Sequence, residues 1–535
     1  MIKRIADLKK MLNHRSETIF GAAMVMSSLT LIGSLLGILR NALLAGRFGA
    51  SGNLDIYYSS FRLPDLIYNI FVVGAISAAF IPVFSDYWAK EKEKAWQFVN
   101  VILMGLGLFI GFFALIIGIF ASPILSLILR GFDPTKLEMA VILTRIMMIQ
   151  PVFLGISSVL SGILKKFNLF FSSALAPLMY NLGIIVGILI LVPLFGLKGI
   201  SLGVVLGAVL HLLIQIPALI GTGFKLKLNF SYFKELKEGL NKITVIMATR
   251  SLGIVVYQFF LLGITGIATM LKEGSLAILN FANDIQNLPQ IVFALAFAEA
   301  AFPRLAEFEA EQKREDYLKV FISTLSQIIF FLIPFAVWFI VFREPIVRFL
   351  LGYGKFDWQA TIKTMEVLAI LSAGMVFQGI NAYLLRVFFS KKDALRPFLA
   401  SLTAYSLGFL LCYYGGLNFG LSGLAGAIAC TYLLYFLILF VFLRHYIPFS
   451  FFKEFFHSFA RIIFISFVSG ITGYLTFSFL EGLLPTEKVF YLLVNTGIAF
   501  VFSLVVFVAL SYQLKIKELN ELIEFIKRKI YVRKR

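Results

Sequence analysis

The chain contains run after run of roughly 20 or more mostly apolar residues, and these runs restrict its fold more than any other feature. A helix of roughly 20 apolar residues crosses a hydrocarbon core of about 30 Å. The runs are continuous, whereas the strands of a transmembrane barrel alternate in polarity over about ten residues. Only 14% of the residues are charged, against about a quarter in soluble proteins. We therefore predict an all-α polytopic membrane protein.

The runs, separated by turn and charge signals, predict about fourteen transmembrane helices. Their approximate cores are 20–45, 56–85, 97–121, 138–163, 170–194, 199–221, 243–269, 275–302, 320–342, 360–385, 397–415, 420–443, 459–480 and 489–511. The even-numbered loops and the two termini hold roughly 34 Lys and Arg, against roughly 9 on the opposite side, which predicts that both termini are cytoplasmic. This bias explains most of the net charge of +19, so no nucleic-acid partner is predicted.

Both ends of the chain are basic. The segment Met1 to Arg15 is followed by a long apolar run without a convincing cleavage site, and we expect an uncleaved cytoplasmic lead-in. The pattern of the C-terminal segment predicts an amphipathic helix that lies on the anionic inner leaflet, with binding to a partner as the alternative. Its apolar face contains Ile516, Leu519, Leu522, Ile523, Ile526 and Ile530.

Short segments recur at an offset of about 224 residues. "PVFLGI" (151–156) resembles "MVFQGI" (375–380), "YNLG" (180–183) resembles "YSLG" (405–408), and "FGLKG" (195–199) resembles "FGLSG" (419–423). A repeat of about six spans returns the chain to the same side, so both copies share one orientation. This predicts two six-helix bundles related by a pseudo-two-fold axis along the membrane normal, with a substrate site between them and two additional helices. A duplicated channel or scaffold is the alternative.

The repeat also predicts how the chain is divided. We expect a lead-in (1–19), an N-terminal lobe (20–232), a C-terminal lobe (233–448), two additional transmembrane helices (449–512) and a basic tail (513–535).

Basic residues also fall inside predicted spans, among them Arg40, Arg62, Arg145, Arg250 and Lys363. A charge at the bilayer centre costs about 2.5 to 3.5 kcal/mol, so such residues normally face a bundle interior or a wet cavity. Glu138 lies seven residues before Arg145, and Glu366 lies three residues after Lys363. Local ion pairs therefore explain Arg145 and Lys363 as well as a function does.

Arg40 and Arg250 have no acidic residue within one helical turn. We predict that they bind a phosphate of the substrate, because a guanidinium holds phosphate oxygens bidentately. Snorkelling to the membrane interface is the alternative. In the second span, Asp55, Arg62 and Asn69 follow one another at steps of seven and form a polar stripe.

The eighth span carries a second polar face. Asn280, Asn283, Asp284 and Asn287 follow the spacing i, i+3, i+4, i+7 of one helix face. We predict that this face binds the sugar or peptide part of a substrate, with interhelical hydrogen bonds as the alternative.

No cofactor or metal site is predicted. Both cysteines lie in apolar runs and the four histidines are scattered. A membrane-embedded enzyme would need an acid/base pair or a metal cluster, and the sequence shows neither. A sodium site, proton linkage or the membrane potential could each drive such a transporter, and several acidic residues are available for a coupling ion.

Two segments resemble a known family. "LGILRNALLAGRFGASGNLD" (36–55) is similar to the first-helix signature of the MurJ (MviN) family, the lipid II flippases of the bacterial cell wall. "FRLPDLIYNIFVVGAISAAFIPVF" (61–84) is similar to that family's second-helix motif, in which Leu-Pro, Gly-Ala and Ala-Phe-x-Pro recur. The family lies within the multidrug/oligosaccharidyl-lipid/polysaccharide exporter superfamily, and its layout of fourteen spans agrees with the predicted one.

The resemblance implies a function. Family members export an undecaprenyl-diphosphate-linked peptidoglycan precursor from the inner to the outer leaflet of the bacterial cytoplasmic membrane. Arginines in a central cavity engage the diphosphate, and the last two helices form a groove for the lipid tail. Arg40 and Asp55 match the family's motif positions. Cell-wall synthesis proteins are the partners that the resemblance implies.

The chain departs from the family's pattern at several charges. Asn41 stands where the family has Asp, Asn69 belongs to a Tyr-Asn pair in place of a basic pair, and Asn283 and Asp284 replace Asp-Arg. Either Arg62 and Arg250 substitute for the missing charges, or the chain moves another polyprenyl-linked oligosaccharide. A drug/cation antiporter of the same superfamily is the third reading. The predicted substrate-binding residues are Arg40, Asn41, Asp55, Arg62, Asn69, Arg250, Asn280, Asn283, Asp284 and Asn287.

Overall fold

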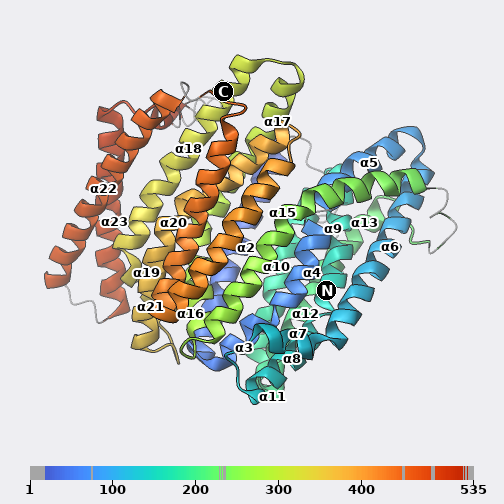
Figure 1. The fold of residues 1–535 in the computed structure, drawn as a ribbon, viewed down its shortest axis with the longest axis horizontal. Helices are drawn as coiled ribbons and strands as arrows, with labels where there is room; N and C mark the ends of the chain where they lie inside the picture. The colour runs from blue at the N-terminus through green and yellow to red at the C-terminus, as the bar shows by residue number, and fades with distance from the viewer. Residues whose placement is uncertain are drawn as a thin grey trace, which may run out of the picture. The chain divides into compact units, whose positions relative to one another are not determined.

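The structure is a computed structural model that describes residues 19–527 except 74–75, 228, 230–231, 233–235, 449–451, 484–487, 522 and 525–526. Within these residues the elements are α- and π-helices, with no strand, which confirms the predicted all-α class. The chain divides into two compact units, Met1–Ala277 and Ile278–Arg535 (Figure 1). The division falls inside one helix, near its start.

The elements of unit 1 are α2 (Ile19–Phe48), α3 (Gly52–Ser60), α4 (Arg62–Tyr68), η1 (Asn69–Val73), α5 (Ile76–Lys90), α6 (Lys92–Ile119), α7 (Ala121–Ile128), α8 (Pro134–Met147), α9 (Gln150–Lys166), α10 (Phe170–Val186), η2 (Gly187–Leu191), α11 (Val192–Phe195), α12 (Lys198–Leu213), α13 (Ile216–Gly221), α15 (Lys237–Thr269) and the start of α16 (Ser275–Pro289). The rest of α16 and all later elements belong to unit 2: η3 (Gln290–Leu295), α17 (Ala296–Ala310), α18 (Arg314–Val341), α19 (Arg343–Leu351), α20 (Trp358–Ser390), α21 (Leu395–Leu443), α22 (Phe452–Leu483) and α23 (Val489–Gln513).

Eleven helices of the described residues are long and apolar enough to cross a membrane, fewer than the fourteen spans predicted. Two predicted spans, 56–85 and 275–302, are interrupted by the π-helical segments η1 and η3. Two others, 397–415 and 420–443, are joined in α21 across Gly420, whose φ of 61° is not helical. The count therefore differs where the backbone departs from a regular helix.

The two interruptions occupy corresponding places in the repeat. Pro64 precedes η1 and Pro289 directly precedes η3, and the two prolines are separated by the offset at which the sequence segments recur. A proline removes one helical hydrogen bond, and π-helical turns accommodate such a break. The second span of each half therefore contains a π-helical segment after its proline.

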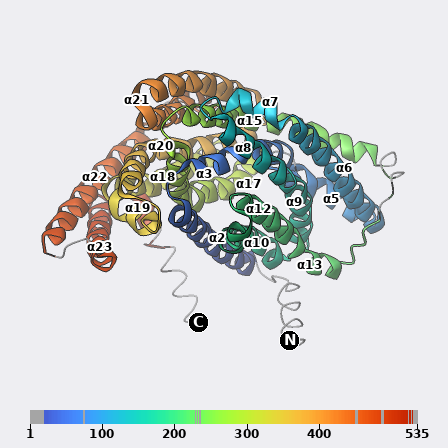
Figure 2. The same cartoon turned by 90° about the horizontal axis from the view of Figure 1, so that it is seen from below.

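Close backbone packing fixes α10 and α12 against each other. A Cβ added to Gly183 would lie 2.2 Å from the Cα of Gly207, and one added to Gly203 would lie 2.5 Å from the Cα of Gly187. Only glycine permits this approach, which is typical of helix packing in membranes. Helix α10 also contacts α2, next to it in Figure 2, and so places its polar residue Asn181 beside α2.

The last two helices pack on α18 within unit 2 (Figures 1 and 2). The buried indole Nε1 of Trp338 donates to Ser503 Oγ at 3.0 Å. Ser469 Oγ donates to the carbonyl of Ser503 at 2.8 Å, and Ser503 Oγ donates to the carbonyl of Ser469 at 2.7 Å. This polar core joins α18, α22 and α23 into one packed group.

The start of the basic tail also packs on unit 2. Ile516 and Leu519 are only 2% and 4% exposed, and Glu521 Oε2 accepts a hydrogen bond from Gln327 of α18 at 2.9 Å. The first turn of the tail's apolar face, which was predicted to lie on the inner leaflet, is thus buried against other residues of unit 2. Leu522, Ile526 and Ile530 of that predicted face lie outside the described residues.

Candidate functional site

Arg40 of α2 is held by amide side chains. Its Nε and Nη2 donate to Asn41 Oδ1 at 3.2 and 3.0 Å, and its Nη1 donates to Asn181 Oδ1 of α10 at 3.1 Å. These hydrogen bonds orient the half-buried guanidinium without neutralising its charge. Two of the predicted substrate-binding residues, Arg40 and Asn41, thus form hydrogen bonds with each other. Sequence analysis missed Asn181, although it lies in the recurring segment "YNLG".

Arg62 of α4 reaches a different helix. Its Nε donates to Thr265 Oγ1 of α15 at 2.7 Å, and it also interacts electrostatically with the half-buried Asp65. Asn69, the next residue of the predicted polar stripe, donates to the carbonyl of Asp65 one turn earlier at 2.8 Å. Arg250 lies in α15 itself, but its side chain lies outside the described part of the chain. Arg62 is therefore anchored to the helix that carries Arg250.

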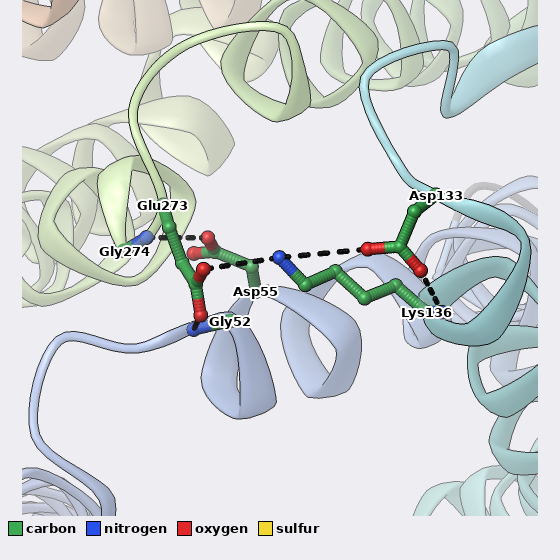
Figure 3. Close-up of polar contacts among 6 residues, drawn as sticks. All are labelled: Gly52, Asp55, Asp133, Lys136, Glu273 and Gly274. Atoms are coloured by element: carbon green, nitrogen blue, oxygen red, sulfur yellow. Dashed lines mark hydrogen bonds and ion pairs between the residues drawn. The ribbon is translucent and has the colours of Figure 1, made fainter.

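Asp55 of α3 caps the start of α16 (Figure 3). Its Oδ2 accepts from the backbone N–H of Gly274 at 2.6 Å, and its Oδ1 accepts from the N–H of Ala277 at 2.9 Å. The first N–H groups of a helix need external acceptors, and a negative charge there interacts favourably with the helix dipole. Asp55 is only 4% exposed, so both of its oxygens are engaged in a buried turn.

Glu273, in the turn between α15 and α16, connects that turn to two further helix starts (Figure 3). Its Oε1 accepts from the N–H of Gly52 at 2.8 Å, and its Oε2 lies 3.1 Å from Lys136 Nζ. Asp133 caps α8 by accepting from the N–H of Lys136 at 2.9 Å. Gly274 has a φ of 86°, and a Cβ there would lie 2.3 Å from the carbonyl oxygen of Ala50. The turn is therefore fixed to α3 and α8.

The Lys136 ammonium and the Gly52 N–H hold the pKa of Glu273 below its ordinary value of 4.5. A lowered folded-state pKa stabilises the protein above the ordinary pKa, and this contribution is lost as the pH falls through the folded value. We expect Glu273→Gln to lower the thermal stability slightly at about pH 7 and not below about pH 3, measured by unfolding scans of the purified protein. Glu315→Gln, which alters an exposed carboxylate of α18, is the control. An unchanged difference across this pH range would contradict the ion pair.

Carboxamides of α16, η3 and α20 form a cluster in unit 2. Gln286 Nε2 donates to Asn287 Oδ1 at 3.1 Å and to Gln378 Oε1 of α20 at 3.1 Å, and lies 3.5 Å from Asn283 Oδ1. Gln290 Nε2 donates to the same oxygen of Gln378 at 2.6 Å. Sequence analysis missed the three glutamines: Gln286 lies off the predicted face, Gln290 follows its last residue, Asn287, by three positions, and Gln378 lies in a distant segment. Its segment, "MVFQGI", is nevertheless one of the recurring segments.

The predicted site residues are divided between the two units. Unit 1 holds Arg40, Asn41, Asp55, Arg62, Asn69 and Arg250, and unit 2 holds Asn280, Asn283, Asp284 and Asn287. The predicted ion pair of Lys363 and Glu366 is confirmed at 2.8 Å. No group of three or more His, Cys, Asp and Glu suited to a metal ion occurs within the described residues.

Comparisons with known proteins identify a family that this chain resembles over most of its length. The sequence model of the family described as "Lipid II flippase MurJ" matches residues 44–494. A protein of Thermotoga maritima described as "Probable lipid II flippase MurJ" is 28% identical over 495 residues, covering 92% of this chain and 96% of that protein. A protein of Burkholderia cenocepacia described as "Lipid II flippase MurJ" is 25% identical over 385 residues, covering 71% and 75%.

Solved structures agree in fold. A structure titled "Lipid II flippase MurJ, inward closed conformation" matches with a TM-score of 0.75 and 24% identity, covering 92% of this chain and 99% of that one. An inward-facing MATE family transporter of the MOP superfamily matches with a TM-score of 0.64 and 15% identity, covering 79% and 97%. At these identities the likeness shows a shared architecture of membrane helices.

Proposed function

The chain belongs to the lipid II flippase MurJ family, and on that premise we propose that it carries lipid II from the inner to the outer leaflet of the bacterial cytoplasmic membrane. The observation that carries this proposal is the family match, which spans residues 44–494. The reaction is transport by alternating access, so no catalytic residue is assigned. The roughly 34 basic residues of the even loops and termini support an orientation with both termini in the cytoplasm.

Arg40 is the proposed principal ligand of the substrate's diphosphate. A guanidinium binds phosphate oxygens through parallel charge-assisted hydrogen bonds, which are about twice as strong as neutral ones. Asn41 and Asn181 reduce the conformational freedom of the Arg40 side chain before substrate arrives, because both accept from it. Preorganisation of this kind lowers the entropy cost of binding. Arg62 and Arg250 are the proposed auxiliary ligands.

The carboxamide cluster of α16 is the proposed site for the sugar or peptide part of the substrate. Amide groups both donate and accept, as sugar hydroxyls and peptide groups require. Gln286 Oε1 is buried and makes no hydrogen bond among the described residues, so the cluster retains acceptor capacity. Asn280 and Asp284 are half-buried on the same helix. A coupling ion and cell-wall synthesis partners stay predictions from the sequence.

Complementation tests the proposal. The chain is expressed in a bacterium whose own lipid II flippase can be switched off, and we expect it to restore growth and cell shape. Purified protein in vesicles supplies a second readout, the appearance of labelled lipid II in the outer leaflet. Failure of both assays by well-folded protein would reject lipid II as the substrate. Movement of another polyprenyl-diphosphate glycan in the same vesicles would then identify the alternative cargo.

A further inference from the structure

An open cavity of about 580 Å³ lies on the outer side of unit 1, between α6 and the α8–α9 pair. Pockets for small molecules span roughly 300–1,000 Å³. The cavity exists partly because Gly111 of α6 carries no side chain, and a Cβ built there would meet no atom within 4 Å. Its rim contains Leu115 and Ile119, which are 64% and 59% exposed. These apolar side chains mark a surface that faces lipid.

Arg145 is the one charged side chain that lines this cavity. A local ion pair with Glu138 was one of two interpretations of this residue, but Arg145 forms no ion pair with Glu138 in the part of the chain that the structure describes. Instead, its Nε donates to the carbonyl of Gly118 at 3.0 Å, at the last turn of α6. A cation stabilises a helix C-terminus, which explains this hydrogen bond. The remaining guanidinium N–H groups have no partner among the described residues, and the side chain is exposed.

The cavity has a polar end and an apolar end. Gly118 and Arg145 lie at one end, and Gly111 and Phe153 lie at the other. Gly111 precedes Gly118 by seven residues of α6, a rise of about 10 Å along the helix. The chain runs along α6 toward the connection to α8 and then returns along α8 and α9. Gly118 and Arg145 therefore lie nearer this connection, and Gly111 and Phe153 lie deeper in the membrane. A membrane lipid has the same orientation, because its headgroup lies at the interface and its acyl chains extend toward the bilayer centre.

We propose that this cavity binds an anionic phospholipid, with the phosphate on the guanidinium of Arg145 and one acyl chain along α6 past Gly111. Charge complementarity selects this occupant, because a lipid-facing cation is costly unless an anion accompanies it. A second copy of the chain would supply an apolar surface without the anion. The inference concerns a lipid of the surrounding membrane and does not depend on which substrate the protein transports.

Lipid binding to the purified full-length protein tests the proposal. Native mass spectrometry measures adducts with phosphatidylglycerol and with phosphatidylcholine, the zwitterionic control. We expect the parent to prefer phosphatidylglycerol, and Arg145→Gln to lose that preference with roughly tenfold weaker binding. Gly111→Leu fills the apolar end and keeps the charge, and we expect it to weaken binding of the same lipid. Gly497→Leu is the matched control, because a Cβ at Gly497 also meets no atom within 4 Å.

Each outcome decides the assignment. Equal binding of the two lipids by the parent, or an unchanged preference in Arg145→Gln, would overturn the role of the arginine. Unchanged affinity in Gly111→Leu would overturn the position of the chain. A dimer of the parent that Gly111→Leu dissociates would identify a second copy as the occupant. If Arg145→Gln is not folded, the comparison of Gly111→Leu with Gly497→Leu still tests the cavity.

Discussion

We expect the replacement of Arg40 by alanine to abolish rescue in the flippase-depleted bacterium, although the variant should reach the membrane at the parental level. The substitution removes a guanidinium that both Asn41 and Asn181 orient. Each hydrogen bond to a charged group contributes about 1.5–3 kcal/mol, so the loss of two to a diphosphate lowers affinity by at least about 100-fold. Growth after depletion and the amount of variant in isolated membranes are the two measurements.

Two further substitutions separate charge from geometry at this position. Arg40→Lys keeps the charge but loses the planar fork, so we expect partial rescue. Arg47→Lys makes the same change two turns along α2, where Arg47 Nη1 donates to the carbonyl of Ile188 at 2.9 Å. A lysine can also donate to that carbonyl, so rescue should be complete. Full rescue by Arg40→Ala would remove Arg40 from the proposed diphosphate site.

Features that depend on local pattern were predictable from the sequence. Apolar runs identified most of the membrane-spanning helices, because the bilayer imposes their length and requires that their backbone hydrogen bonds form internally. The spacing of Lys363 and Glu366 predicted an ion pair that forms, because residues three apart are neighbours on a helix. The assignment of Arg40 and Asn41 to the substrate site stays a prediction, although the two side chains form a hydrogen bond.

Features that depend on long-range packing were not predictable in this way. Spacing alone indicates nothing about Asn181, which meets Arg40, 141 residues earlier in the chain, because α10 packs against α2. The spacing within its own span likewise gives no indication that Gln378 contacts Gln286 and Gln290 of a distant segment. Arg145 and Glu138 have suitable spacing, yet Arg145 turns to the end of α6, which offers an unpaired carbonyl. A side chain can therefore bind a group from a distant segment in place of a neighbour on its own helix.

Asp55 shows how this distinction affects an assigned role. It was predicted as a substrate ligand, and the structure uses both of its oxygens to cap α16. We expect Asp55→Ala to leave two N–H groups without an acceptor in a buried turn, at about 1–3 kcal/mol each. The free energy of unfolding should fall by roughly 2–5 kcal/mol, visible as a lower thermal midpoint of the purified protein.

Conservative and matched variants decide between capping and substrate binding. Asp55→Asn keeps one acceptor oxygen, so its loss of stability should lie between those of the parent and Asp55→Ala. Asp133→Ala removes a more exposed cap of a single N–H, at a cost of about 1 kcal/mol. If Asp55 acts by capping, transport in the three variants follows their stability. An Asp55→Ala protein that has parental stability but no longer transports would instead place the carboxylate in contact with the substrate. The N–H groups at the start of α16 would then need another hydrogen-bond acceptor.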